Sequence, residues 1–298
     1  MKKLVQIVLV VALAYTTSAY GGVGASWLKI PVGVASAALG EAAVAHPLGE
    51  DAAWLNPAAL ALLRQSSAGF GHARWIADVR SSAVEAQLVT ARGNLLLFGN
   101  VLTVPGLERR VMASTAPLGT FDAHQVQAGA GFGRVFGGRL ALGVAAKWVY
   151  EKIHLVDGGT VALDLGATTV VPTFGLDFGV AVRNLGPGYG LGNDTVELPT
   201  VVSAGVSRGM SLWGRPEGLR GWLAWRHIRG EGSHVALGTQ VGVVTGLNLR
   251  LGYQIGYETR GLSLGVGLHL GRVRFSYALV PFREGFGEAH LASFAYRL

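Results

Sequence analysis

The chain has 298 residues, with 25 Lys and Arg against 18 Asp and Glu, a formal net charge of +7 and no cysteine. It has no dense basic run of the kind that follows a phosphate backbone, which argues against a nucleic-acid partner. Only 14% of the residues are charged and the mean hydropathy is +0.39, whereas charged residues make up about 25% of an ordinary soluble domain. The composition therefore favours a membrane protein.

The first residues have the pattern of an export signal. Met1-Lys2-Lys3 is basic, Leu4 to Ala14 is apolar, and Thr17-Ser18-Ala19 supplies small residues at a cleavage site. We expect residues 1–19 to be a signal peptide, because their apolar core is short for the alternative, a membrane anchor. No Cys follows this core, so the chain is not a bacterial lipoprotein.

Residues 20–65 form the next predicted unit, in which Gly24 to Arg64 is the one long segment with helical spacing. Asn56-Pro57 fits a helix start, because Asn caps a free N–H and Pro suits the first position. The segment is either an ordinary surface helix or a plug inside a barrel, and we predict the plug. Its predicted gate residues are Asp51, Trp54, Asn56 and Pro57, with a purely structural cap as the alternative.

The segment that precedes the predicted gate is apolar. Trp27, Leu28 and Ile30 either line an apolar ligand pocket or pack the plug against the barrel wall. A pocket of this kind is mostly apolar with few polar anchors.

From Ser66 onward the dominant period is two, as in Arg139 to Ile153, where large apolar residues alternate with small or charged ones. Beyond the signal no apolar run reaches the roughly 18 residues of a membrane helix. In lipid such strands must close into a barrel, where all backbone groups are paired. The residues 66–298 are therefore predicted to form an all-β, fourteen-stranded antiparallel transmembrane β-barrel, with the small helical plug in its lumen. The predicted strands are 66–75, 80–90, 94–103, 122–136, 139–153, 160–171, 174–184, 198–208, 219–228, 233–243, 247–257, 261–270, 272–280 and 289–298.

Short and long connections alternate along this series, as in outer-membrane barrels, whose short turns and chain ends are periplasmic. The alternation holds if 104–121 is one long loop, so the ambiguous segment 107–115 is assigned to that loop. His154 to Gly159 and Leu185 to Glu197 are expected to be longer loops, and Gly209 to Gly218 is an exception, a long connection where a short one is expected. The pattern predicts the bacterial outer membrane, with both termini in the periplasm.

Charged residues fall on the inward face of successive predicted strands. They are Lys147, Glu151, Asp164, Asp177 and Arg183. We expect them to form an ionic ladder along the wall, since the lumen of such barrels is polar. The alternative is a role in guiding a polar head group.

Enzyme chemistry has little support in this sequence. Gly-x-Ser-x-Gly is spelled at Gly205 to Gly209 and at Gly261 to Gly265, but both lie in alternating segments and not at the strand-to-helix turn of a nucleophile elbow. The chain has no cysteine, and its histidines form no His-x-x-x-His pair. A Ser and a His from different strands remain the alternative, as in a membrane-barrel esterase. We predict no enzyme, no cofactor and no metal.

The last strand alternates to its end, with Phe294, Tyr296 and Leu298 on one face. It resembles the assembly signal of outer-membrane barrels, although those more often end in Phe. The barrel assembly machinery and outer-membrane lipid are therefore expected partners.

The stretch WLKIPVGVASAALGEAAVA followed by DAAWLNPAAL resembles the N-terminal signature of the PorV/PorQ family, within the FadL-like outer-membrane barrels. Similar positions follow in order along the mature chain, among them Ala162 to Gly166, Val182 to Gly186 and Leu249 to Tyr253. The chain departs from the family in having Ser36-Ala37 and Leu39-Gly40-Glu41, where Arg-Ala and Met-Gly-Gly are frequent. It also has Ser276 where an acidic residue often precedes the Tyr-Ala pair.

This resemblance implies a fourteen-stranded barrel with the N-terminal segment inside, and two alternative functions. FadL-like members pass hydrophobic small molecules across the outer membrane. The PorV branch acts instead as a partner of the type IX secretion system and holds secreted cargo proteins. A continuous apolar path through the lumen would favour the first, and a sizeable apolar surface on the outer loops the second.

Overall fold

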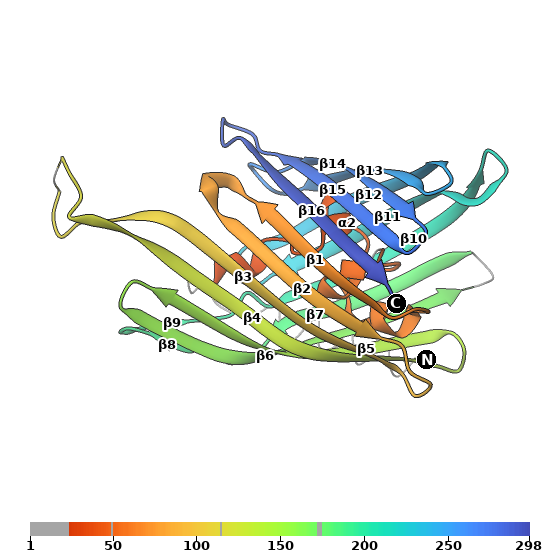
Figure 1. Ribbon diagram of the computed structural model, residues 1–298, viewed down its shortest axis with the longest axis horizontal. Helices are drawn as coiled ribbons and strands as arrows, with labels where there is room; N and C mark the ends of the chain where they lie inside the picture. Colours follow the sequence, from red (N-terminus) through yellow and green to blue (C-terminus); the bar gives the residue numbers. More distant parts are fainter. Residues whose placement is uncertain (1–23, 49, 114, 172–174) are drawn as a thin grey trace.

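The computed structural model describes residues 24–48, 50–113, 115–171 and 175–298, so the predicted signal peptide lies outside the described residues. Within this part of the chain, fourteen strands form one closed antiparallel barrel (Figure 1), which confirms the predicted fold class. The strands, in the order in which they are paired around the wall, are β1 Ser67–Arg74, β2 Arg80–Leu88, β3 Asn94–Arg109, β4 Gly119–Phe136, β5 Leu140–Ile153, β6 Val156–Val171, β7 Leu176–Leu185, β10 Val201–Leu212, β11 Arg215–Ile228, β12 Gly232–Val244, β13 Leu247–Ile255, β14 Leu262–Leu270, β15 Val273–Pro281 and β16 Glu288–Arg297.

The barrel closes where the first and last strands meet. β1 pairs with β16 along its whole length, from Ser67 opposite Arg297 to Arg74 opposite His290. Closure leaves no strand at a free edge among the fourteen, so each strand pairs with a neighbour on both sides. This is the condition for a sheet to lie in lipid.

The alternating residues of each strand face two different environments. On β5, Trp148 is 48% exposed on the outer surface, whereas its neighbour Lys147 is 5% exposed and faces the lumen. Large apolar side chains dominate the outer surface of the other strands as well, including Phe70, Val84 and Leu97. The predicted assignment of the bulky face to the outside and the small or charged face to the lumen is therefore correct.

The connections distinguish the two ends of the barrel. We call the end with the connections 89–93, 137–139, 213–214, 245–246 and 271–272 the short-turn end, and the opposite end, with 186–200, 256–261 and 282–287, the long-loop end. The prediction of a long connection from Gly209 to Gly218 is wrong. β10 and β11 continue as a hairpin, and only Trp213 and Gly214 join them. Both residues have positive φ (53° and 70°), which suits a tight turn between strands.

Two other predicted loops are shorter than expected. β3 runs on to Arg109 after a register shift between Val104 and Leu107, and β4 begins at Gly119, so 107–109 belongs to a long hairpin and not to a loop. β6 begins at Val156, which leaves His154 and Leu155 as the connection from β5. The prediction that 107–115 does not form a strand of its own is confirmed for its described residues. In the connection from β7 to β10, β8 Tyr189–Leu191 and β9 Asp194–Val196 form a small hairpin.

Short helices lie in the N-terminal segment, which Figure 1 shows in red and orange inside the barrel. They are η2 Ser26–Lys29, α2 Val34–Ala38, η3 Glu50–Trp54 and η4 Pro57–Leu62, and η5 Ile76–Asp78 follows between β1 and β2. Among the described residues, no helix has the length and hydropathy of a membrane span.

The described part of the predicted plug 20–65, residues 24–48 and 50–65, runs through the lumen from one end of the barrel to the other. Gly24 lies against Val196 at the long-loop end, and Lys29 forms an ion pair with Glu231 between β11 and β12. At the short-turn end, the amide of Asn94 donates to the carbonyl oxygen of Leu60 at 2.7 Å. The first described residue, Gly24, therefore lies at the opposite end from Leu298. The prediction that both termini are periplasmic concerns residues 20–23, which lie outside the described residues.

Candidate functional site

The plug is seated on glycines that face the lumen from the barrel strands. A Cβ built on Gly143 would lie 2.1 Å from the carbonyl oxygen of Pro57, and one on Gly252 would lie 2.2 Å from the backbone nitrogen of Gly40. Real Cβ atoms do not approach other atoms this closely, so only glycine allows the plug backbone to touch the wall. Similar close approaches occur at Gly133, Gly166, Gly179 and Gly265.

Asn56 and Pro57, two predicted gate residues, are buried where the plug meets the wall. The side chain of Asn56 is fully buried, accepts from the backbone N–H of Ala58 at 3.0 Å and donates to the carbonyl oxygen of Val44 at 2.8 Å. Its cap therefore begins η4, which is a 3-10 helix, and also joins two parts of the plug.

Trp54 connects the plug to the wall on two sides. Its indole N–H donates to Glu85 on β2 at 3.0 Å, and its ring packs edge-to-face on Phe98 of β3, with centroids 4.7 Å apart. Its carbonyl oxygen accepts from Arg183 on β7 at 3.0 Å. The side chain of Asp51, the remaining predicted gate residue, lies outside the described residues.

A buried ionic contact joins the middle of the plug to the wall. The carboxylate of Glu41 forms an ion pair with Arg226 on β11 and lies 3.6 Å from Arg183 on β7, and the side chains of Glu41 and Arg226 are 4% and 2% exposed. Gly40 and Glu41 both have positive φ (61° and 58°), which turns the plug so that the carboxylate faces both arginines. Breaking such a pair leaves an uncompensated buried charge, so the contact holds the plug in place.

Sequence reasoning missed this contact. Glu41 appeared only as a departure from the family pattern, and Arg226 was not singled out. The available signal was parity, because Arg226 falls on the inward face of its strand together with Trp222 and Ala224, which are both buried.

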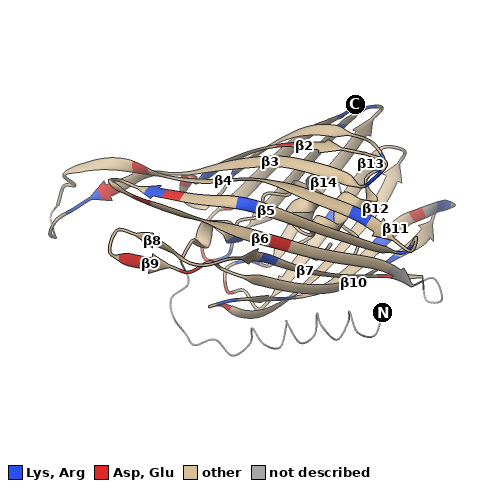
Figure 2. Cartoon of the chain, turned by 90° about the horizontal axis from the view of Figure 1, so that it is seen from below, with Lys and Arg blue, Asp and Glu red and all other residues tan. Residues whose placement is uncertain are grey.

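The predicted ladder of charges divides into separate clusters along the barrel strands, whose charged residues are coloured in Figure 2. Lys147 donates to Asp164 at 2.7 Å and to the side-chain oxygen of Asn184 at 2.6 Å. Asp177 instead pairs with Arg220 on β11 and with His46 of the plug at 3.1 Å. The five residues therefore line the lumen, but they do not form one continuous ladder.

Glu151 belongs to a third cluster, at the long-loop end. It accepts from the hydroxyl of Tyr189 on β8 at 2.7 Å and from the amide of Gln125 at 3.2 Å. Burial and the nearby Glu151 carboxylate raise the pKa of Tyr189 well above its usual value, so the phenol remains a neutral donor. This contact ties the β8–β9 hairpin to the barrel wall.

The predicted apolar contacts lie beside that hairpin. Trp27 and Leu28 are buried and Ile30 is half-buried. They belong to an apolar cluster with Leu102, Val149, Ala162, Tyr189 and Leu198. The cluster lies inside the long-loop end of the barrel, at the entrance to the lumen, and there the plug and wall side chains pack together.

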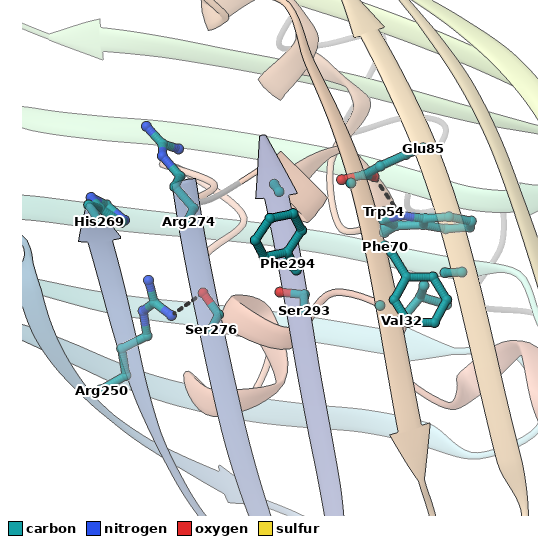
Figure 3. Close-up of a pocket in the computed structure, with 14 residues that line it drawn as sticks. Val32, Trp54, Phe70, Glu85, Arg250, His269, Arg274, Ser276, Ser293 and Phe294 are labelled. Carbon is teal, nitrogen blue, oxygen red and sulfur yellow. Dashed lines mark hydrogen bonds between the residues drawn. The ribbon is translucent and has the colours of Figure 1, made fainter. Parts of the chain in front are cut away.

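The lumen retains a small cavity at the short-turn end (Figure 3). Trp54 and Glu85 lie on one side of it and Arg250, His269 and Arg274 on the other. Its volume is about 30 Å³, enough for one or two waters, since a single water needs at least ~10–15 Å³ by the same measure. A hydrophobic molecule does not fit in this cavity.

The residues of the lumen are arranged for packing and charge pairing. Among the described residues, no group of three or more His, Asp or Glu side chains could hold a metal ion.

Phe294, Tyr296 and Leu298, of the predicted assembly signal, are 48%, 40% and 66% exposed on the outer surface of the closing strand. Their role in assembly remains a prediction.

A closed fourteen-stranded barrel with its N-terminal segment in the lumen is the fold of the FadL-like barrels. The chain is similar to a deletion mutant of TodX, a monoaromatic hydrocarbon channel, with a TM-score of 0.58 and 11% identity over 84% of this chain and 94% of that chain. It is also similar to a Pseudomonas aeruginosa FadL homologue, with a TM-score of 0.54 and 11% identity over 89% and 95%. No protein-family model and no curated protein matches the chain. These likenesses show the fold.

Proposed function

We propose that this protein is an outer-membrane channel in which the plug gates the passage of hydrophobic small molecules. One observation carries the proposal: the described part of the plug extends through the lumen from the long-loop end to the short-turn end and is joined to the wall by polar contacts, among them those of Glu41 with Arg226 and Arg183. The fold shared with a hydrocarbon channel and a FadL homologue supports the same function.

Two features of the described residues bear on how passage would occur. An apolar cluster that includes Trp27 and Leu28 stands at the long-loop end, where a hydrophobic molecule would first bind. The plug stands in the lumen, and the cavity at its short-turn end, about 30 Å³, is too small for such a molecule. Passage therefore requires movement of the plug away from its glycine seats.

A disulfide between plug and wall tests this requirement. A Cβ built on Gly205 of β10 lies 3.5 Å from the Cβ of Val44 in the plug, a separation that suits a disulfide. The natural chain has no cysteine, so the V44C/G205C pair would be the only thiols. We expect cells that contain the oxidised pair to take up radiolabelled toluene at no more than about a tenth of the rate of the reduced pair, because the plug cannot leave.

The matched control is a disulfide within the wall. A Cβ on Gly71 of β1 lies 3.9 Å from that of Ser293 on β16, and neither residue belongs to the plug. Oxidation of G71C/S293C should leave uptake unchanged. Equal uptake by oxidised and reduced V44C/G205C would show that the plug is not the gate. The channel function would be overturned if cells with the unmodified protein took up toluene and a long-chain fatty acid no faster than cells without it.

A second candidate function is the binding of secreted proteins, as implied by the PorV/PorQ resemblance. The observation that favours it is the tip of the long β3–β4 hairpin, where Val111 and Met112 are each 75% exposed and Leu118 is 68% exposed. An exposed apolar surface of this kind suits a protein partner. Co-purification of a secreted protein with the natural chain, lost in V111S/M112S, would support this function over transport.

A further inference from the structure

One arginine of the barrel wall points out of the barrel. Ser207 faces the lumen, where its hydroxyl donates to Asp177 at 3.1 Å, so the next residue on β10, Arg208, faces outward and is exposed. Arg208 has no hydrogen-bond or ion-pair partner in the part of the chain that the structure describes. In this respect it differs from Arg220, the lumen-facing arginine of the neighbouring strand, which pairs with Asp177 and Glu217.

Apolar side chains surround this cation on the outer surface. Val206 and Met210 flank Arg208 along β10. On β11, Gly221 lies opposite Arg208, and Leu223 is the next outward-facing residue after Gly221. Met210 and Leu223 are 43% and 47% exposed, as expected of lipid-facing residues. A charge on the lipid face of such a barrel costs ~2–4 kcal/mol at the midplane and less toward the interface, so Arg208 needs a counter-charge that the described chain does not supply.

A hollow of about 510 Å³ lies beside the guanidinium, on the outer surface of β10 to β13. Its floor is Gly221, where an added Cβ would meet nothing within 4 Å. Its lining includes Leu237, Leu251 and Tyr253, whose side chains are 43%, 44% and 40% exposed. The volume falls within the ~300–1,000 Å³ of small-molecule sites, and it far exceeds the 30 Å³ cavity in the lumen.

We propose that this hollow binds an anionic membrane lipid, with an acyl chain against Gly221 and the headgroup phosphate paired with Arg208. Charge complementarity and apolar walls in one site select an amphiphile that carries a negative charge. β10 ends at Leu212, four residues beyond Arg208, so the backbone of Arg208 lies roughly 13 Å along the strand from its end at ~3.3 Å per residue. The arginine side chain is long enough to extend toward headgroups at the short-turn side, as arginines near an interface do. The proposal depends on the barrel lying in a membrane and is independent of what passes through the lumen.

Native mass spectrometry of the full, delipidated protein tests the site with two added probes, phosphatidylglycerol, which is anionic, and phosphatidylcholine, which is zwitterionic. We expect one tightly held phosphatidylglycerol and at least tenfold weaker retention of phosphatidylcholine. R208Q should abolish the preference for the anionic lipid, and G221L, which fills the hollow, should abolish retention of both. Heat-dependent mobility on a gel confirms that each variant is folded.

Two control variants separate this site from general effects on the surface. R134Q removes another exposed arginine of the outer face, which lies over the ring of Phe136 at 5.7 Å. G99L adds a side chain at another outward glycine, where the nearest contacts of a Cβ are 3.8 and 4.0 Å away. Both should retain phosphatidylglycerol as the unmodified protein does. Equal retention of the two lipids, an unchanged preference in R208Q, or a dimer that only G221L dissociates would each overturn the proposal.

Discussion

The two faces of the β10–β11 hairpin place the same residue types in opposite surroundings. On the inner face, Arg226 is 1% exposed and pairs with Glu41 of the plug, and Arg220 pairs with Asp177. On the outer face, Arg208 is exposed beside a hollow and has no partner among the described residues. The two cations buried inside the barrel are therefore paired within the chain. A cation on the outer face can instead pair with an anionic group of the membrane.

Glycine differs between the two faces in the same way. Inward glycines such as Gly143 and Gly252 are contacts, because the plug backbone fills the space that a side chain would occupy. The outward Gly221 is open, with nothing within 4 Å of an added Cβ. Gly143 and Gly252 are therefore seats for the plug, whereas Gly221 marks a depression in the outer surface.

The largest expected effect comes from removing the inner cation that holds the plug. Arg226→Leu leaves the carboxylate of Glu41 buried, with Arg183 at 3.6 Å as its remaining cation. We expect a loss of about 3–5 kcal/mol in the free energy of unfolding, measured by urea titration of the protein in phosphatidylcholine vesicles. The double variant E41L/R226L is the control and should recover much of the loss. An unchanged midpoint for R226L would show that the pair does not hold the plug.

A side chain on an inner glycine should displace the plug. Gly143→Val places a Cβ against the backbone of Pro57, and we expect overpacking to destabilise the protein by about 3 kcal/mol and to open the pore. Planar-bilayer conductance is the measurement. Gly99→Val, on the outer face, should leave both stability and conductance as they are, and equal effects of the two variants would remove the distinction between the faces.

Removing the outer arginine should have the opposite sign. Arg208→Leu in phosphatidylcholine, which offers no net negative charge, should raise the free energy of unfolding by about 1–2 kcal/mol, because a cation on the lipid face is costly. In vesicles that contain phosphatidylglycerol the gain should shrink or reverse. A loss in phosphatidylcholine as large as that of R226L would mean that Arg208 has a partner within the protein.

The smallest expected effect concerns a neutral group of the inner face. The hydroxyl of Ser207 donates to Asp177 and accepts from Arg220, each at 3.1 Å. Ser207→Ala should cost about 1 kcal/mol, the typical value of one buried hydrogen bond. The same urea titration measures it. A loss of unfolding free energy larger than that of R226L would show that neutral hydrogen bonds stabilise the inner face more than its ion pairs do.

Some of the site follows from the sequence and some does not. Lys147 and Asp164 were placed on the inward face by period two, and they form an ion pair at 2.7 Å because β5 and β6 are adjacent in the chain. The Tyr189 partner of Glu151 could not be foreseen in the same way, because Tyr189 comes from a hairpin that folds back over the barrel end. The Trp213–Gly214 turn was missed because Gly, Pro and Glu near the hairpin end suggested a loop, although the strands continue through them.

The strand periodicity, the number of strands and the closed barrel were determined by the sequence alone. Alternation is a local property, and a polar backbone in lipid permits only one closed arrangement of such strands. The contacts that hold the plug against the wall were decided by the tertiary structure. Glu41 contacts Arg226, which lies 185 positions away in the chain. Arg208 has no partner among the described residues because apolar side chains surround it on the outer surface. Period two assigns a residue to one face of the wall, but the partner it finds there depends on which distant segment the closed barrel brings beside it.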